Sequence, residues 1–213
     1  MMDLFGDLLF QKQEIVKDAY LLKGFALQNE ATLLSDIAQV IHDAPLRHMV
    51  TPGGFTMSVA MTNCGDLGWV TDRKGYRYAT LDPISNLAWP TMPDSFKQLA
   101  TQAANVAGFD DFAPDACLIN QYKIGARMRL HQDKDEQDFS QPIVSVSFGL
   151  PANFQFGGFE RADKPIKLLL THGDVVVWGG ESRLRFHGIL PLKAGHHPDL
   201  GNVRVNLTFR KAG

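Results

Sequence analysis

The sequence predicts an α+β protein that is mainly β, built on a double-stranded β-helix, that is, a cupin-like jelly roll. Two observations predict this class. From residue 115 onward, short runs of strand-forming residues alternate with Gly and Pro turns, as in sandwiches and barrels. Before that point, two stretches carry apolar residues at the 3-4 spacing of amphipathic helices. The expected strands span residues 116–123, 128–133, 143–150, 153–156, 166–170, 175–178, 183–190 and 202–210.

The first half of the chain holds the two helices and a segment of a different kind. The helices are expected over residues 29–44 and 94–107, the second capped by Asp94 and ended by Gly108. Residues 65–93 combine turn residues and aromatics with no sustained period, which indicates a long ordered loop or a short-stranded lid. The other expected elements are a loose terminus over 1–13, a strand pair or bent strand over 14–25, a turn over 52–54 and a strand over 55–62.

Length and composition favour a single domain over residues 1–213, with about 1–115 as N-terminal extension, helices and lid, and about 116–213 as the jelly-roll core. The net charge of −2 argues against a protein that coats nucleic acid, but it leaves room for a small basic groove. No apolar run approaches the ~20 residues of a membrane span. The acidic start lacks the basic region of a signal peptide, and Cys64 and Cys117 are expected to be buried thiols in a reducing cytoplasm.

The stretch from Leu130 to Glu136 contains the first candidate site. His131 and Asp133 lie two positions apart, so both side chains project from one face if the stretch is extended. A neutral imidazole beside a carboxylate makes two corners of a 2-His-1-carboxylate set, which holds Fe(II) and leaves coordination positions open. The third corner must come from a distant histidine, and His187 is the candidate.

Two other His-x-Asp pairs are weaker candidates. The pair at positions 172 and 174 encloses Gly173, which indicates a turn feeding a strand. The pair at positions 197 and 199 encloses Pro198, which lacks the N–H that a central strand needs. An isolated His-x-Asp is often ordinary surface polarity, so spacing alone leaves the metal site and a solvated pair both open.

The last strand suggests a site for a small dicarboxylate. Between residues 203 and 210 odd positions are apolar, while Arg204, Asn206 and Arg210 share the other face. Arginine clamps carboxylates through paired, charge-assisted hydrogen bonds. Asn120 and Tyr122 share a face of an earlier strand and could complete the hydrogen bonds. A last strand with one solvent-exposed face remains the alternative.

Several of these elements occur together, and the combination resembles a known family. They are Asn120-Gln121-Tyr122, His131-Gln132-Asp133, His187, Arg204-x-Asn206-x-x-x-Arg210 and residues 49–54. Together they resemble the AlkB family of Fe(II)/2-oxoglutarate dioxygenases, over nearly the whole chain. The Arg-x-Asn-x-x-x-Arg element is more specific than the metal-binding set, which many oxygenases share.

The resemblance implies a role for each candidate residue. The implied iron ligands are His131, Asp133 and His187, with O2 taking a remaining position. The residues implied to bind 2-oxoglutarate are Arg204 and Arg210 as carboxylate partners and Asn120, Tyr122 and Asn206 as hydrogen-bonding groups. The residues implied to bind substrate are Trp69, which stacks on a flipped base, Asp135, which receives its exocyclic amine, and Tyr76 and Arg161, which contact backbone or base.

The implied reaction is oxidative dealkylation of N-alkylated nucleobases, such as N1-methyladenine and N3-methylcytosine, with release of aldehyde, succinate and CO2. The implied partner is single- or double-stranded alkylated DNA, with RNA as a further substrate, acted on by a cytoplasmic monomer with no membrane partner and a nucleotide-recognition lid. Two other functions stay open. The same oxygenase scaffold could hydroxylate a protein or small molecule, or a cupin-like module could bind ligand without turnover.

Overall fold

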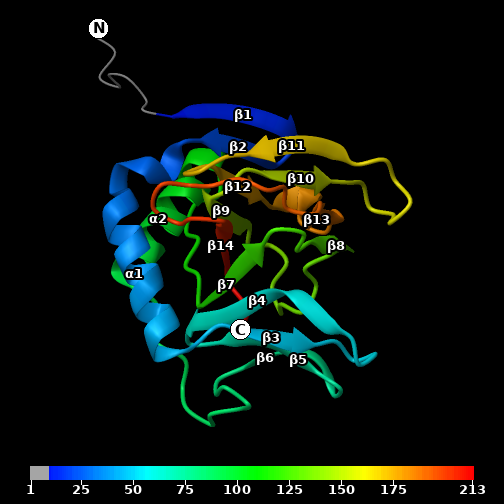
Figure 1. Cartoon of the computed structure of the whole chain (residues 1–213). Helices are drawn as coiled ribbons and strands as arrows, with labels where there is room; N and C mark the ends of the chain where they lie inside the picture. The colour runs from blue at the N-terminus through cyan, green and yellow to red at the C-terminus, as the bar shows by residue number, and fades with distance from the viewer. Residues whose placement is uncertain (1–9) are drawn as a thin grey trace, which may run out of the picture.

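The computed structural model describes residues 10–213, whose strands form two facing sheets and a separate hairpin (Figure 1). The larger sheet runs β1 (Gln11–Val16), β2 (Ala19–Lys23), β12 (Val175–Trp178), β9 (Ile143–Gly149), β14 (Val203–Arg210), β7 (Ala116–Lys123), β4 (Thr56–Gly65) and β3 (Arg47–Val50). The strand pair expected over 14–25 is the hairpin of β1 and β2, which begins earlier than expected. The loose terminus expected over 1–13 is wrong for residues 11–13, and its first nine residues lie outside the described part of the chain.

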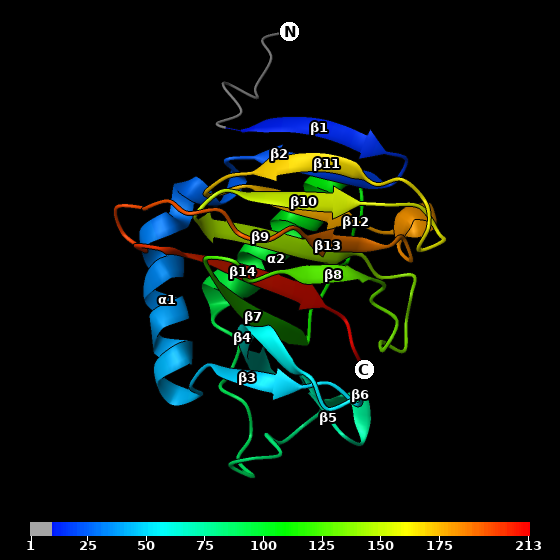
Figure 2. The same cartoon turned by 45° about the vertical axis from the view of Figure 1, so that its right-hand side comes forward.

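The smaller sheet faces the middle of the larger one (Figure 2). Its antiparallel strands run β11 (Ile166–Leu170), β10 (Ala152–Phe156), β13 (His187–Ile189) and β8 (Met128–His131). Leu118 and Trp178 of the large sheet pack in one buried cluster with Phe154 and Ile189 of the small sheet. These two facing antiparallel sheets are the predicted jelly roll.

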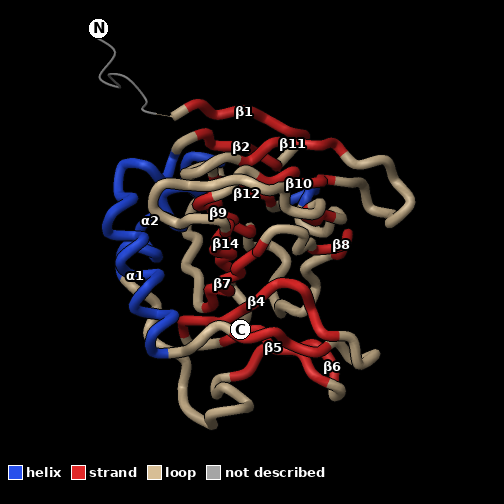
Figure 3. Tube along the Cα trace, viewed as in Figure 1, coloured by secondary structure: helices blue, strands red, loops and turns tan. Residues whose placement is uncertain are grey.

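The helices cover the outer face of the larger sheet, as Figure 3 shows in blue. A short 3-10 turn, η1 (Phe25–Asn29), leads into α1 (Glu30–Asp43), and α2 (Asp94–Ala107) follows the first strands of the chain. Leu33 and Phe96 of the helices pack against Val146 and Leu207 of the sheet. The molecule therefore has three layers, with the large sheet buried between the helices and the small sheet.

Strand β14 lies in the middle of the large sheet and is buried along most of its length. Its apolar side chains Val205, Leu207 and Phe209 pack in the cluster beneath the helices. Its polar side chains, from Arg204 to Arg210, line a narrow pocket inside the jelly roll. The alternation expected from the sequence is confirmed, whereas the alternative of a solvent-exposed face is wrong.

Residues 65–93 contain a short-stranded hairpin. Strands β5 (Gly68–Asp72) and β6 (Gly75–Ala79) pair only with each other, and a single bridge joins Leu81 to Ala88 farther along. The indole of Trp89 lies against this pair and its Nε1–H donates to Ala79 O at 2.9 Å. We refer to β5 and β6 as the aromatic hairpin.

Several expectations about the elements are wrong, and among them the strand expected over 128–133 ends at His131, so Asp133 lies in the loop after β8. Helix α2 is capped by Pro93, and Asp94 is its first residue, although Gly108 ends it in the left-handed conformation as expected. The strand expected over 183–190 is only β13, because the 3-10 turn η2 (Gly180–Ser182) and a following turn occupy its first part. Strand β3 was not expected, since its Arg-His-Met-Val sequence has a single buried residue and no apolar alternation.

The two cysteines are buried and free, as predicted. Cys64 of β4 and Cys117 of β7 lie directly opposite each other in the large sheet. Burial, together with the neighbouring Cys64, raises the pKa of the Cys117 thiol well above its usual value. In the described part of the chain, no helix combines the length and the apolar character needed to span a membrane.

Candidate active site

The smaller sheet brings the three proposed metal ligands together. His131 ends β8 and His187 begins β13, and the two residues are direct partners across these strands. Asp133 follows two positions after His131, with Oδ1 3.6 Å from His131 Nε2 and Oδ2 3.7 Å from His187 Nε2. One ligand atom from each residue lies within 4.8 Å of the other two. The pairing of β8 with β13 thus brings together two histidines that are 56 residues apart in the sequence.

Backbone carbonyls fix the orientation of both imidazoles. The carbonyl of Arg129 lies 2.9 Å from His131 Nδ1, and the carbonyl of Arg185 lies 3.1 Å from His187 Nδ1. A carbonyl can only accept, so each Nδ1 carries the proton and each Nε2 presents its lone pair. Both lone pairs point toward the carboxylate of Asp133, which is the donor set that Fe(II) takes in facial 2-His-1-carboxylate sites.

The charges at the site favour metal binding. Burial and the nearby His131 lower the pKa of His187 to about 4, so its imidazole is neutral at pH 7. Burial opposes ionisation of Asp133, but Arg210 and then the two histidines outweigh it and hold the pKa of this carboxyl below its usual range. The residues present therefore fit a divalent metal ion, because neither His187 nor Asp133 carries a proton that the ion would have to displace at neutral pH.

Arg210 connects the metal ligands to the end of β14. Its Nη2–H donates to Asp133 Oδ2 at 2.7 Å, and its Nε–H donates to the same oxygen at 3.0 Å. The same Nε also lies 3.3 Å from Glu136 Oε1. Glu136 in turn is paired with Arg183, at 3.1 Å from Oε2 to Nη2. Arg210 is thus shared between a metal ligand and a second buried carboxylate.

Arg204 differs from Arg210 because its charge is not matched. The side chain is 1 % exposed, and only Nη2 donates, to Ser147 Oγ at 2.8 Å. Nε and Nη1 have no hydrogen-bond partner within residues 10–213. The guanidinium lies 5.0 Å from the centre of the Tyr122 ring, and burial lowers its pKa. A buried cation with two free donors is costly by itself, so the pocket fits an anionic ligand.

The pocket between Arg204 and the metal ligands is narrow, about 50 Å³, and polar on one side. Asn206 Nδ2–H donates to Ser145 Oγ at 2.9 Å, and Thr208 Oγ1–H donates to Asn206 Oδ1 at 3.0 Å. Asn120 lies opposite Asn206 in the sheet, and its Oδ1 has no partner in the described chain. The five residues expected at a dicarboxylate site, Asn120, Tyr122, Arg204, Asn206 and Arg210, all line this pocket.

Of the four residues expected to bind substrate, three contact one another and the fourth lies apart from them. Trp69 and Tyr76 of the aromatic hairpin stack at 5.7 Å between ring centres, with an interplanar angle of 19°. Trp69 Nε1–H donates to Asp135 Oδ2 at 2.9 Å. Arg161 lies apart from this group, where its Nη1–H donates to Leu130 O at 2.5 Å beside the strand that carries His131.

Three contributors were not expected from the sequence: Tyr78, Glu136 and Arg183. Tyr78 of β6 donates its hydroxyl to Glu136 Oε1 at 2.6 Å, and burial raises the pKa of this tyrosine well above its usual value. Arg183 Nη1–H donates to the backbone carbonyl of Asp133 at 2.8 Å. Each contact spans at least 50 residues of sequence, and no local spacing indicates it. The only available signal was the acidic Glu136 close to Asp133.

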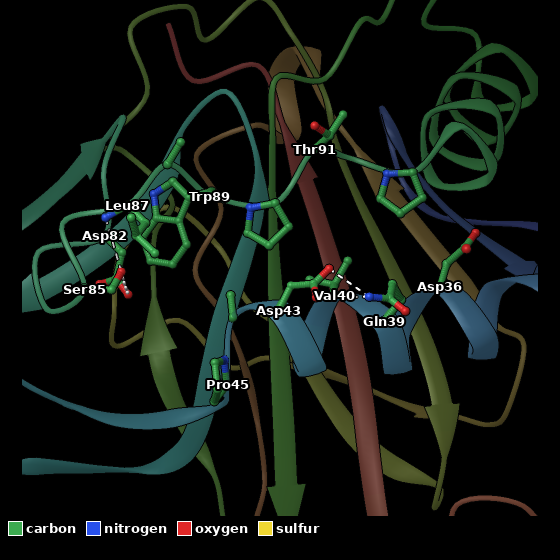
Figure 4. Close-up of a pocket in the computed structure, with 14 residues that line it drawn as sticks. Asp36, Gln39, Val40, Asp43, Pro45, Asp82, Ser85, Leu87, Trp89 and Thr91 are labelled. Atoms are coloured by element: carbon green, nitrogen blue, oxygen red, sulfur yellow. Dashed lines mark hydrogen bonds between the residues drawn. The ribbon is translucent and has the colours of Figure 1, made fainter.

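A larger hollow of about 460 Å³ lies elsewhere, between α1 and the loop before α2 (Figure 4). Its acidic side chains already have partners: Asp82 is paired with Arg47 at 2.6 Å, and Asp43 accepts from Gln39 at 2.9 Å. The residues that line the hollow include no member of the metal-binding triad and neither Arg204 nor Arg210. Its size therefore does not make it the chemical centre.

A jelly roll that carries two histidines and a carboxylate at neighbouring strands defines a mononuclear non-haem metal oxygenase. A family model described as "2OG-Fe(II) oxygenase superfamily" matches residues 18–210. The alpha-ketoglutarate-dependent dioxygenase AlkB of Escherichia coli is 58% identical over 213 residues, covering 100% of this chain and 99% of the relative. The AlkB homolog of Caulobacter vibrioides is 40% identical over 210 residues, covering 94% and 93%.

The solved structure titled "The structure of OsALKBH1" has a TM-score of 0.82 at 27% identity, covering 94% of this chain and 100% of that one. The chain belongs to the 2OG-Fe(II) oxygenase superfamily and, within it, to the AlkB family. Its metal is Fe(II), and 2-oxoglutarate and O2 are its co-substrates.

Proposed function

We propose that the protein removes alkyl groups oxidatively from the ring nitrogens of nucleobases such as N1-methyladenine and N3-methylcytosine. The observation that carries this proposal is the stacked pair Trp69 and Tyr76, held beside the triad by the Trp69–Asp135 hydrogen bond. Aromatic faces next to a carboxylate suit a base that is flat and cationic when alkylated at these positions.

Iron would be held by His131 Nε2, Asp133 and His187 Nε2, since the Nδ1 atom of each histidine faces a backbone carbonyl and leaves Nε2 for the metal. When bound, iron and 2-oxoglutarate supply the oxidant that hydroxylates the alkyl carbon. The product carbon then leaves as an aldehyde, with succinate and CO2 as the cosubstrate's products. The chain positions the reactants and excludes water around them.

Arg204 would pair with the carboxylate of 2-oxoglutarate that lies farther from the metal. The support is its buried guanidinium, whose Nε and Nη1 lack a partner among the described residues. Arg210 would meet the carboxylate beside the keto group, because its guanidinium is already within 3.0 Å of a metal ligand. Asn120, Tyr122 and Asn206 supply hydrogen bonds along the pocket, whose Asn120 Oδ1 is also unpartnered.

The alkylated base would enter between Trp69 and the His131 ring, and its exocyclic amine would take the place of the indole N–H on Asp135. A damaged base pairs poorly, so its extrusion costs less than the few kcal/mol needed for an intact base. A carboxylate at Asp135 favours a cationic base over a neutral one, which selects damaged over normal bases. Arg161 and Tyr76 would contact the nucleic-acid backbone or base, and the aromatic hairpin would act as the nucleotide-recognition lid.

The wider setting is proposed on fewer observations. DNA in single- or double-stranded form is the expected partner, with RNA as a further substrate. The enzyme acts as a monomer and as one dioxygenase domain over residues 1–213. The two buried free thiols favour a reducing cytoplasm.

The direct test is formaldehyde and succinate release from an oligonucleotide that contains N1-methyladenine, with Fe(II), 2-oxoglutarate and O2. We expect both products in equal amounts, none with the unmethylated oligonucleotide, and none with Asp133→Ala. Succinate formed without formaldehyde from any alkylated DNA or RNA would redirect the assignment to a protein or small-molecule substrate. No succinate under any condition would leave only ligand binding.

A further inference from the structure

Two opposite residues of the aromatic hairpin reach two consecutive residues that follow the metal ligand Asp133. Trp69 and Tyr78 are direct partners across β5 and β6. Trp69 Nε1–H donates to Asp135 Oδ2 at 2.9 Å, and the Tyr78 hydroxyl donates to Glu136 Oε1 at 2.6 Å. Two hydrogen bonds therefore join the hairpin to the segment that follows Asp133, one of them exposed and the other partly buried.

The Tyr78–Glu136 contact is connected through Arg210 to the proposed metal ligand Asp133. Glu136 is 6 % exposed, and its Oε1 is shared by the Tyr78 hydroxyl and by Arg210 Nε at 3.3 Å. Arg210 donates twice to Asp133 Oδ2, at 2.7 Å from Nη2 and at 3.0 Å from Nε, and the same Nε lies beside Glu136 as an ion pair. Oε2 of Glu136 is already paired with Arg183, which leaves the Tyr78 hydroxyl as the hydrogen-bond donor to Oε1, with Arg210 as a second cation beside it.

We propose that Tyr78, acting through Glu136, is a positioning residue that couples closure of the aromatic hairpin to 2-oxoglutarate binding at Arg210. While Tyr78 donates to Glu136, part of that carboxylate's charge is satisfied and Arg210 stays turned toward Asp133. Without the hydroxyl, Oε1 has only the Arg210 cation beside it, and Arg210 is drawn from Asp133 toward Glu136.

The coupling has to run in both directions. A cosubstrate carboxylate that engages Arg210 takes it away from Glu136, which then depends more strongly on Tyr78. Cosubstrate binding therefore strengthens the contact that holds the hairpin closed, and closure strengthens cosubstrate binding by the same factor. Closure of the aromatic hairpin and binding of 2-oxoglutarate therefore favour each other through the charge on Glu136 Oε1.

The test uses the full-length protein with Mn(II) as a redox-inert metal and without nucleic acid. Calorimetry gives the Kd of 2-oxoglutarate, and hydrogen exchange gives the protection of the β5 and β6 amides with and without it. In the wild type we expect 2-oxoglutarate to slow exchange in the hairpin. Tyr78→Phe should abolish this slowing and raise the Kd about tenfold, the scale of one hydrogen bond to a charged group.

The matched control is Tyr20→Phe, which removes a hydroxyl from a partly buried tyrosine. Tyr20 lies in β2, next to the edge strand β1 of the large sheet and outside the aromatic hairpin. It should leave both measurements at wild-type values. A Tyr78→Phe variant that keeps the wild-type Kd, or whose hairpin is still protected by 2-oxoglutarate, would overturn the coupling.

The inference rests on the proposed cosubstrate site and not on the proposed nucleobase substrate. Failure to bind 2-oxoglutarate in the wild type would overturn the cosubstrate site and the coupling together. Failure to dealkylate nucleic acid would leave the coupling intact, because no measurement in this test includes a substrate.

Discussion

At the scale of single residues, Arg204 shows how the pocket is prepared for its ligand. A guanidinium that is 1 % exposed, with two donors that lack partners in residues 10–213, is a charge that the fold keeps at a cost. Such a group lowers the stability of the ligand-free protein and is satisfied when an anion arrives. Binding affinity at this position is therefore gained at the expense of folding stability.

Arg204→Met separates these two effects. We expect the Kd of 2-oxoglutarate to rise on the order of 100-fold, as when one partner of a buried charge pair is truncated. The ligand-free protein should melt at the same or a higher temperature, because an unmatched buried charge is replaced by an apolar chain of similar length. Calorimetry and thermal unfolding check the two parts, with the exposed Arg127→Met as control. Wild-type affinity in Arg204→Met would contradict the assignment.

The sequence predicted the individual ligands well because they follow local rules. The arginines of β14 share a face by the period of a strand, whereas Asp133 meets His131 at 3.6 Å from the loop after β8, so only their closeness in sequence was a correct guide. The sequence could not predict that Glu136 meets Tyr78, 58 positions away. That contact depends on where the hairpin folds back, which no spacing within either segment records.

At the scale of elements, the aromatic hairpin is positioned by a close approach at Gly68. A Cβ built on Gly68 would lie 2.3 Å from Nε1 and Cε2 of the Trp89 indole, which itself donates to Ala79 O. The absence of a side chain at this position lets the ring lie against both strands at once. The hairpin is thereby held by two contacts, one between Trp89 and Ala79 and the other between Tyr78 and Glu136.

Gly68→Ala should displace the Trp89 ring and weaken the hairpin. We expect a loss of about 1–3 kcal/mol in unfolding free energy, the usual cost of overpacking, measured by urea denaturation. Hydrogen exchange should show faster exchange at the β5 and β6 amides. Gly53→Ala is the matched control, since its Cβ would meet Phe55 at an ordinary 3.5 Å and it should be nearly neutral. Equal stability of the two variants would contradict this account.

Strands were predictable where the apolar pattern is strong and less so where packing decides. The bounds of β7, β11 and β12 match the expectation, because each is a run of strand formers between turns. Strand β13 is shorter than expected, since Ser182 and Arg183 are used in a turn that holds Gln141 and Asp133 through Arg183. The residues just before β13 have the apolar character of a strand, but the hydrogen bonds of Arg183 to Gln141 and Asp133 favour the turn.

At the scale of the whole molecule, the triad joins segments that are far apart in the chain, so metal binding should stabilise the fold. We expect Mn(II) at 100 times its Kd to add about 2.7 kcal/mol to the unfolding free energy. For a chain of this size the melting temperature should rise by about 2–4 °C per kcal/mol. Chelator should reverse the rise.

The control for metal stabilisation is His187→Gln, which leaves β13 in place but removes one ligand. Its melting temperature should respond little to Mn(II), whereas the exposed His42→Gln should respond as the wild type does. A full response in His187→Gln would show that the ion stabilises the protein at some other position.

Strand β14 combines two tasks in a single alternation, with the core on its odd residues and the cosubstrate pocket on its even ones. Sliding this strand by one residue against β7 and β9 would drive Arg204 and Arg210 under the helices and turn Val205 and Leu207 into the pocket. No stable molecule can therefore carry an intact core together with a misaligned reaction centre here. Correct folding of β14 therefore also ensures a correctly arranged active site, and an insertion or deletion within this strand abolishes the fold and the activity together.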